Sequence, residues 1–257
     1  MTQPASTSRS IATLVLAFAQ IATPLLPMIG IGNPVGEQSG QTQTLITPAG
    51  WAFAIWGPLY FGTIVYAIWQ LFPAQRERDL VRRIGWHASG AFLGNAVWVA
   101  YTQLWGLGFP SVLIIVFTLV NLLSILRVFA GTRAYTAAER LAAVLPLSAL
   151  AGWLTAATIV NIAAALNFHG IVLPGPGPLI AAAILVVGGV IVSAALVGTG
   201  GNPWYPLPFL WALFAIHQKI GSMHAEIATA TLVAGFLVVV TLIGMLARAE
   251  RRRRYLG

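Results

Sequence analysis

Residues 141–166 read LAAVLPLSALAGWLTAATIVNIAAAL and contain no Asp, Glu, Lys or Arg. An α-helix rises about 1.5 Å per residue, so roughly 20 predominantly apolar residues cross the hydrocarbon core of a bilayer. This stretch exceeds that length and therefore predicts a membrane-spanning helix.

The sequence on both sides repeats the same pattern. Apolar segments extend over 11–31, 51–72, 85–104, 111–130, 141–166, 179–197, 204–220 and 227–247. Segment 204–220 is the weakest, because prolines at its start leave only a short apolar run, and a re-entrant segment is the alternative there. We predict an all-α polytopic membrane protein with eight transmembrane helices.

The composition supports this class. Hydrophobic residues make up 58% of the 257 residues and charged residues only 8%, with a mean hydropathy of +0.83. A typical soluble domain is about half apolar and about a quarter charged. The composition excludes a soluble enzyme, a disordered chain and a nucleic-acid-binding module, and makes the lipid bilayer the expected partner. The absence of cysteine excludes disulfides, thiolate chemistry and cysteine-ligated metals.

The distribution of basic residues predicts the topology. The net charge of +8 comes from arginines that cluster at the ends of the apolar runs. With eight spans and the N-terminus inside, all of the 14 basic residues except Lys219 fall on the cytoplasmic side. Cytoplasmic loops of membrane proteins carry an excess of Lys and Arg. We therefore predict an integral protein of the plasma (inner) membrane with both termini in the cytoplasm.

A Pro-Gly segment divides the chain. Residues 174–178 read PGPGP, and three prolines in five residues cannot continue a helix. We predict a five-helix bundle in 1–170, a linker in 171–178, and three C-terminal membrane helices with a basic cytoplasmic tail in 179–257.

Asp, Glu, Lys and Arg are missing from the centres of the first six spans. A charge within a bilayer is costly and usually marks an ion or proton path, so the pattern argues against a proton-coupled pump and an ion-coupled transporter. It also removes the usual general acids and bases, and we predict no catalytic residues. The four histidines lie at span ends or in loops without a third ligand nearby, so we predict no metal site.

Aromatic and amide residues in the second and third spans mark part of a candidate site. Trp56 and Tyr60 are four residues apart, so they stack on one helix face. Asn95 and Trp98 likewise share one face of the third span. Packing or interface anchoring is the simpler interpretation of any one of these side chains.

The fifth span carries the clearest pattern. Trp153, Ala157 and Asn161 recur at intervals of four and form one stripe, with a small residue between two polar-tipped ones. Three helices that each present Trp or Asn on one face indicate an aromatic, largely apolar pocket with a few hydrogen-bonding groups. Such a pocket suits a flat hydrophobic ligand.

These motifs resemble the TspO/MBR family of translocator proteins, also called tryptophan-rich sensory proteins. The second span of that family typically reads W-x-F-x-x-x-W-x-x-L-Y after a proline-containing loop. With one residue fewer between Phe53 and Trp56, this chain matches it at Trp51, Phe53, Trp56, Leu59 and Tyr60. The third span of the family carries N-x-x-W, matched by Asn95 and Trp98. The fifth carries W-x-x-x-A-T-x-x-N, matched by Trp153, Ala157, Thr158 and Asn161.

The resemblance covers residues 1 to about 168, and the chain departs from the family in having three further spans. It implies a five-helix bundle, often a homodimer, that binds porphyrins and other hydrophobic ligands. The bound molecule it implies is a porphyrin or haem-like tetrapyrrole, with no obligatory cofactor. The ligand-binding residues it implies are Trp51, Phe53, Trp56, Tyr60, Asn95, Trp98, Trp153, Ala157, Thr158 and Asn161.

The leading hypothesis is an integral membrane receptor, carrier or sensor for a tetrapyrrole or similar flat hydrophobic ligand, held among spans two, three and five. A porphyrin-degrading photo-oxidative enzyme ranks lower, because the spans offer indoles but no acid–base pair. A small transporter that is not coupled to ions and a structural subunit of a membrane complex are the remaining alternatives.

Overall fold

Helices account for the regular structure of residues 6–257, the part of the chain that the computed structural model describes, and no strand occurs in that range. The first part contains α1 (Thr7–Ala22), η1 (Thr23–Ile29), α2 (Val35–Gln41), η2 (Gly50–Ile55), α3 (Trp56–Trp69), α4 (Pro73–Arg76), α5 (Asp79–Trp105), α6 (Phe109–Ala130), α7 (Ala137–Glu139), η3 (Arg140–Val144) and α8 (Leu145–Phe168). The remainder contains α9 (Gly177–Gly198), α10 (Pro206–Ile220), α11 (Ala225–Leu246) and α12 (Ala249–Leu256).

Within the described residues, six helical segments are long and apolar enough to cross a membrane. They are Thr7–Ile29, Gly50–Trp69, Phe109–Ala130, Ala137–Phe168, Gly177–Gly198 and Ala225–Leu246. The helices α5 and α10 fill the other two predicted segments, but α5 begins with charged turns and α10 has only 15 residues. The prediction of an all-α membrane protein is confirmed, and the count of eight spans stays a prediction.

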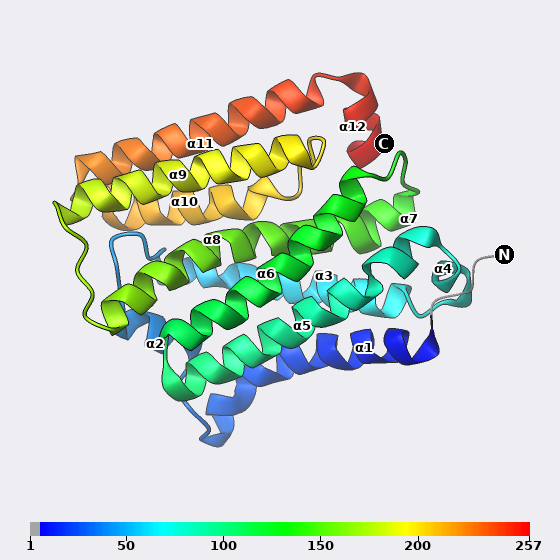
Figure 1. Ribbon diagram of the computed structural model, residues 1–257, viewed down its shortest axis with the longest axis horizontal. Coiled ribbons are helices and arrows are strands. Elements are labelled where there is room, and N and C mark those ends of the chain that lie inside the picture. Colours follow the sequence, from blue (N-terminus) through cyan, green and yellow to red (C-terminus); the bar gives the residue numbers. More distant parts are fainter. Residues whose placement is uncertain (1–5) are drawn as a thin grey trace.

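The long helices run side by side and alternate in direction along the chain (Figure 1). The start of α1 and the end of α12 lie at the same end of the bundle, together with α4 and α7. The arginines belong to segments at that end, whereas Lys219 lies near the opposite end, where α10 finishes. The helices α9, α10 and α11 form a group of their own beside the first five long helices.

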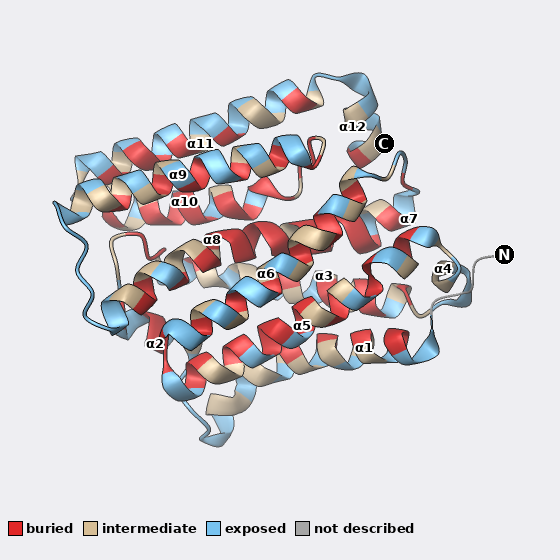
Figure 2. Ribbon diagram, in the orientation of Figure 1, coloured by how far each residue is buried: buried red, intermediate tan, exposed pale blue. Residues whose placement is uncertain are grey.

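The helix α8 is the most buried of the membrane-length helices and occupies the centre of the bundle (Figure 2). It is rich in Ala and Gly, which let neighbouring backbones come close where lipid provides no hydrophobic drive between helices. At Gly152, an added Cβ would collide with the backbone carbonyl oxygen of Tyr205 just before α10. A glycine at this position therefore allows α10 to pack directly on α8.

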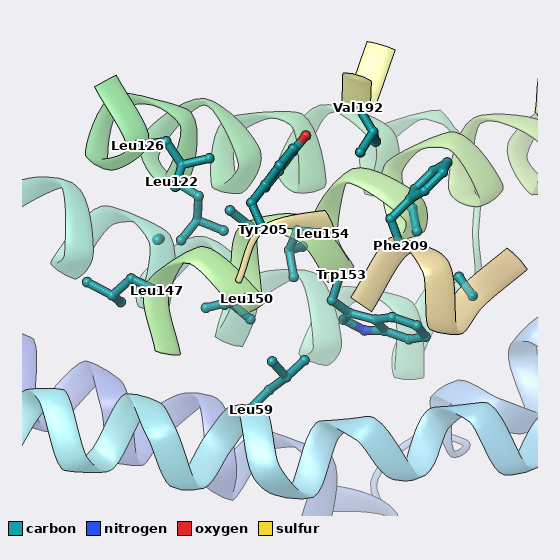
Figure 3. Close-up of a cluster of buried hydrophobic side chains, with 14 of the residues drawn as sticks. Leu59, Leu122, Leu126, Leu147, Leu150, Trp153, Leu154, Val192, Tyr205 and Phe209 are labelled. Carbon is teal, nitrogen blue, oxygen red and sulfur yellow. The ribbon is translucent and has the colours of Figure 1, made fainter. Parts of the chain in front are cut away.

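Large apolar side chains fill the space around α8 (Figure 3). Leu147, Leu150, Trp153 and Leu154 project from this helix, and Leu59 of α3 approaches them from one side. From other sides the cluster receives Leu122 and Leu126 of α6, Val192 of α9, Tyr205, and Phe209 of α10. One continuous core thus joins the two groups of helices.

Polar contacts also cross this junction. The hydroxyls of Thr155 and Tyr205 share a hydrogen bond at 3.1 Å, and the Asn202 amide donates to the Ser148 hydroxyl at 2.7 Å. All four side chains are buried, so these pairs satisfy groups that would otherwise be costly in an apolar setting. They fix the position of α10 along α8.

Candidate ligand-binding site

A cavity lies beside α8 in the half of the bundle away from the chain termini (Figure 1). Its walls come from α2, η2, α5, α8 and α10, and they are mainly apolar. It holds about 470 Å³ of space free of protein atoms, part of which opens to the outside, and only a narrow slot is wide enough for a water-sized group. Five of the ten predicted site residues line it, namely Phe53, Trp98, Trp153, Ala157 and Asn161.

The indole of Trp153 is the most enclosed aromatic group of this cavity, with 3% of the residue exposed. The rings of Phe53 and Trp56 both meet it edge to face, each with its centroid 6.1 Å away. Among the described residues, no hydrogen-bond acceptor lies within reach of the buried Trp153 Nε1. A buried donor without an acceptor costs about 1–3 kcal/mol, so a ligand that supplies an acceptor here would gain that energy.

Asn161 is tied into a chain of hydrogen bonds that joins three helices. Its Oδ1 accepts from Trp98 Nε1 at 2.8 Å, and its Nδ2 donates to the Ser111 hydroxyl at 2.7 Å. Ser111 in turn donates to the carbonyl oxygen of Gly108 at 2.7 Å. Asn161 therefore positions Trp98 of α5 against α8, and in doing so it commits both its Oδ1 and its Nδ2 to protein partners.

Trp56, Tyr60 and Asn95 belong to a neighbouring cluster and do not line the cavity. The rings of Trp56 and Tyr60 stack with centroids 5.0 Å apart, as their spacing predicts. Asn95 Nδ2 donates to Gln20 Oε1 at 3.2 Å and to the Tyr60 hydroxyl at 3.5 Å, while Gln20 Nε2 donates to the Thr63 hydroxyl at 2.8 Å. This network holds α1, α3 and α5 together.

Gln20 and Thr63 were not among the predicted site residues. Gln20 is the only Asn or Gln in the apolar run 11–31, and this is the signal that could have identified it. Nothing in the sequence pairs Gln20 with Asn95 in particular, because the two residues lie 75 positions apart on different helices.

Trp51 and Thr158 also lie outside the cavity lining. Trp51 is 47% exposed and packs edge to face against Trp211 of α10, with centroids 5.0 Å apart. Thr158 donates to the carbonyl oxygen of Leu154 in its own helix at 2.7 Å. The first contact links η2 to the C-terminal helices, and the second satisfies a hydroxyl within α8.

The helix α10 contributes to the site in a way that the sequence did not indicate. Ala212 lines the cavity, and the Trp211 Nε1 donates to the Ala52 carbonyl oxygen at 2.9 Å. The lining also includes Val35 and Ser39 of the short helix α2. The cavity is thus shared between the first five long helices and the C-terminal group.

Two of the described histidines, His169 and His217, contact side chains of neighbouring helices. The rings of His169 and Phe109 stack at 4.4 Å, and His217 Nδ1 lies 2.9 Å from the Thr231 hydroxyl. No three His, Cys, Asp or Glu side chains come together as metal ligands within residues 6–257.

The apolar membrane-length helices, the central small-residue helix α8 and the aromatic-lined cavity define the class of protein: a polytopic integral membrane protein with an apolar cavity beside its central helix. A family model described as TSPO-like protein matches residues 7–245. Because this match spans most of the chain, the chain belongs to the TSPO-like protein family. No curated protein and no solved structure matches the chain.

The family match reaches well beyond the region on which the sequence motifs lie. Those motifs fall in residues 1 to about 168, whereas the match continues through α9, α10 and nearly all of α11. The three C-terminal helices therefore lie within the region that the chain shares with its family.

Proposed function

We propose that the protein is an integral membrane receptor, carrier or sensor that binds a tetrapyrrole or a similarly flat hydrophobic molecule in the cavity beside α8. One observation carries this proposal. Phe53, Trp98 and Trp153 line an apolar cavity, and the buried Trp153 Nε1 has no acceptor among the described residues. Aromatic side chains offer flat faces for a conjugated ring, and a few placed polar groups fix its orientation.

Binding of a macrocycle requires the cavity to widen, because only a narrow slot is free between the aromatic rings. The wall that we expect to move is the short helix α2, which has 7 residues, because η2 is tied to α10 through Trp211. Helices α5 and α8 are held by the Trp98–Asn161–Ser111 hydrogen bonds and form the fixed wall. The ligand is therefore expected to enter from the end where α2 lies.

Fluorescence titration of the purified protein with protoporphyrin IX tests this function. Saturable quenching of tryptophan emission at one porphyrin per chain is the expected result. Two results would mean that porphyrin only partitions into the detergent or the bilayer around the protein. One is quenching that rises without saturation, and the other is quenching of the Trp153→Ala variant equal to that of the wild type.

A second candidate is photo-oxidative degradation of a bound porphyrin by dioxygen. A series of aromatic rings favours it, because Trp153 meets Trp56 at 6.1 Å and Trp56 stacks on Tyr60 at 5.0 Å. In that reaction the porphyrin loses electrons and dioxygen takes them up, and the ring series can share a transient radical formed at Trp153 with Trp56 and the Tyr60 phenol. Illumination of the porphyrin complex in air separates the two functions. If the protein is an enzyme, the wild type should lose porphyrin absorbance faster than the Tyr60→Phe variant does. If it only binds porphyrin, the two proteins should lose absorbance at the same rate.

We further propose that the arginine-rich end of the bundle faces the cytoplasm, in the plasma membrane. The placement of the arginines at one end and Lys219 near the other supports this orientation.

A further inference from the structure

The arginine-rich C-terminal segment folds back onto the bundle. It forms α12, whose Tyr255 is 1% exposed and donates its hydroxyl to the Thr199 carbonyl oxygen at 2.7 Å. The Tyr255 ring lies 5.8 Å from the ring of Tyr135, and Arg254 Nη1 donates to the Ala130 carbonyl oxygen at 3.2 Å. The helix α12 is thus anchored across the ends of α6 and α9 (Figure 1).

This anchoring creates a hollow between α12 and the loop that follows α6. The hollow has a volume of about 670 Å³, open to the outside, and its charged lining consists of Arg133, Arg253, Arg254 and Glu250. Three arginines and one glutamate therefore line the hollow, so its charged lining carries a net positive charge. None of the three arginines lies within 4.0 Å of a carboxylate in residues 6–257.

The arginines of the hollow also retain free hydrogen-bond donors. Arg254 uses one N–H on Ala130, while its buried Nε has no acceptor among the described residues. Guanidinium groups present a planar fork of N–H donors that matches the oxygens of a phosphate group. The charge and the donors of the hollow therefore suit a phosphate-bearing anion.

The position of the hollow indicates where such an anion comes from. It lies where the apolar helices α6 and α11 end, at Ala130 and Leu246, and therefore at the boundary between hydrocarbon and water. Lipid phosphate groups lie at this level, and basic pockets between membrane helices are suited to anionic headgroups. We propose that this hollow binds the phosphate group of an anionic phospholipid. A free phosphate ion has the same chemistry, but it is not concentrated at the boundary between hydrocarbon and water as lipid phosphate groups are.

Native mass spectrometry of the detergent-solubilised full-length protein tests the proposal. Phosphatidylglycerol and phosphatidylcholine of equal chain length are added separately, and the affinity of the first bound lipid is measured. The wild type should bind phosphatidylglycerol at least about tenfold more tightly than phosphatidylcholine.

The variant Arg133→Gln/Arg253→Gln should weaken phosphatidylglycerol binding by about tenfold, because it removes two of the three arginine charges that line the hollow. Arg254 is kept because it anchors α12. The matched control is Arg248→Gln/Arg252→Gln, which removes the same amount of charge. Arg248 lies just before α12 and Arg252 lies on it, and both are exposed and do not line the hollow. This control should change the affinity by less than about twofold. Circular dichroism of each variant, and of the single variant Arg253→Gln, verifies the fold.

Three results would overturn the proposal. Equal affinity for the two lipids would remove the preference for an anion. If the control variant weakened phosphatidylglycerol binding as much as Arg133→Gln/Arg253→Gln does, the loss of affinity would come from the net charge of the protein and not from the hollow. Displacement of phosphatidylglycerol by millimolar inorganic phosphate would identify a soluble anion as the occupant.

Discussion

The indole nitrogen of Trp98 donates a 2.8 Å hydrogen bond to the side-chain oxygen of Asn161, and this bond joins α5 to α8 at the wall of the cavity. Both residues are buried, and the remaining amide of Asn161 continues the connection to Ser111 of α6. Asn161, which the sequence motifs associate with ligand binding, thus first holds the helices that form the wall of the site.

The variant Asn161→Leu should therefore lower both stability and ligand affinity. It leaves the Trp98 N–H and the Ser111 hydroxyl without the Asn161 partner, at a cost of about 1–3 kcal/mol. Thermal unfolding and porphyrin titration measure the two effects. Asn167→Leu is the matched control, because Asn167 is exposed on the same helix, lies outside the cavity lining and makes only an exposed hydrogen bond, to the Gln43 carbonyl oxygen. An Asn161→Leu protein as stable as the control would contradict the role given to the Trp98 bond.

Trp153 should be the residue whose loss weakens ligand binding most. Trp153→Ala removes the ring that meets both Phe53 and Trp56, and should weaken porphyrin affinity by at least about tenfold. Trp153→Phe keeps a flat face but removes the unpartnered N–H, so it should retain part of the affinity. Trp86→Ala, on an exposed side chain, is the control and should leave the affinity unchanged. Equal affinity for all three variants would refute the assignment of the site.

The contribution of α10 can be tested at Ala212. Ala212→Phe places a ring into the cavity and should weaken the porphyrin complex by about tenfold through steric exclusion. Ala183→Phe adds the same ring at an exposed position of α9 and should have no effect on affinity. If Ala212→Phe binds porphyrin as the wild type does, α10 is not a wall of the functional site.

The topology predicts that reporters fused at Gly257 and inserted near Pro174 lie on opposite sides of the membrane. The start of α1 and the end of α12 lie at the opposite end of the bundle from the Pro-Gly linker, and the arginines lie at the end that holds Gly257. Alkaline phosphatase should therefore be active near Pro174 and inactive at Gly257. Activity at Gly257 would refute the cytoplasmic C-terminus.

Docking of α12 should weaken at alkaline pH. Burial raises the pKa of Tyr255 above its ordinary value of 10.0, although the neighbouring Arg254 and Arg251 act in the opposite direction. The neutral phenol is favoured in the docked helix, so this stabilisation is complete below pH 10 and is lost as the pH rises through the raised pKa.

A spin label on an Arg252→Cys variant reports this change, because the chain has no other cysteine. Its mobility should rise above pH 10. Tyr135 also titrates with a raised pKa beside Tyr255, so Tyr135→Phe serves as the control that isolates the contribution of Tyr255. Mobility that does not depend on pH in the Tyr135→Phe background would contradict the role of Tyr255.

The sequence predicted best what depends on one helix alone. Run 141–166 coincides with η3 and α8, since an apolar stretch of this length has few other solutions in a membrane. The spacing of Trp153, Ala157 and Asn161 also predicted a common stripe, and all three line the cavity. In segment 204–220, prolines suggested a re-entrant segment as the alternative to a spanning helix. These prolines lie before α10 or within its first turn, where a helix tolerates them.

The contacts between helices could not be predicted in the same way. Asn95 was expected to share a pocket with Asn161, but its amide bonds to Gln20 and Tyr60. The partner of Trp51 proved to be Trp211, 160 positions along the chain. Such pairs depend on the rotation and depth of each helix. Close backbone packing sets these, and no residue pattern within one helix encodes them.

The close approach of Gly152 to the backbone at Tyr205 has a consequence for biosynthesis. Helix α8 leaves the ribosome before residues 206–220 exist, so the face that later receives α10 has no protein neighbour at first. That face carries the hydroxyls of Ser148 and Thr155, which find their partners Asn202 and Tyr205 only when the chain has grown past them. We expect the nascent protein to remain beside the insertion machinery until this happens. Release of the early helices into lipid is then coupled to synthesis of the late ones.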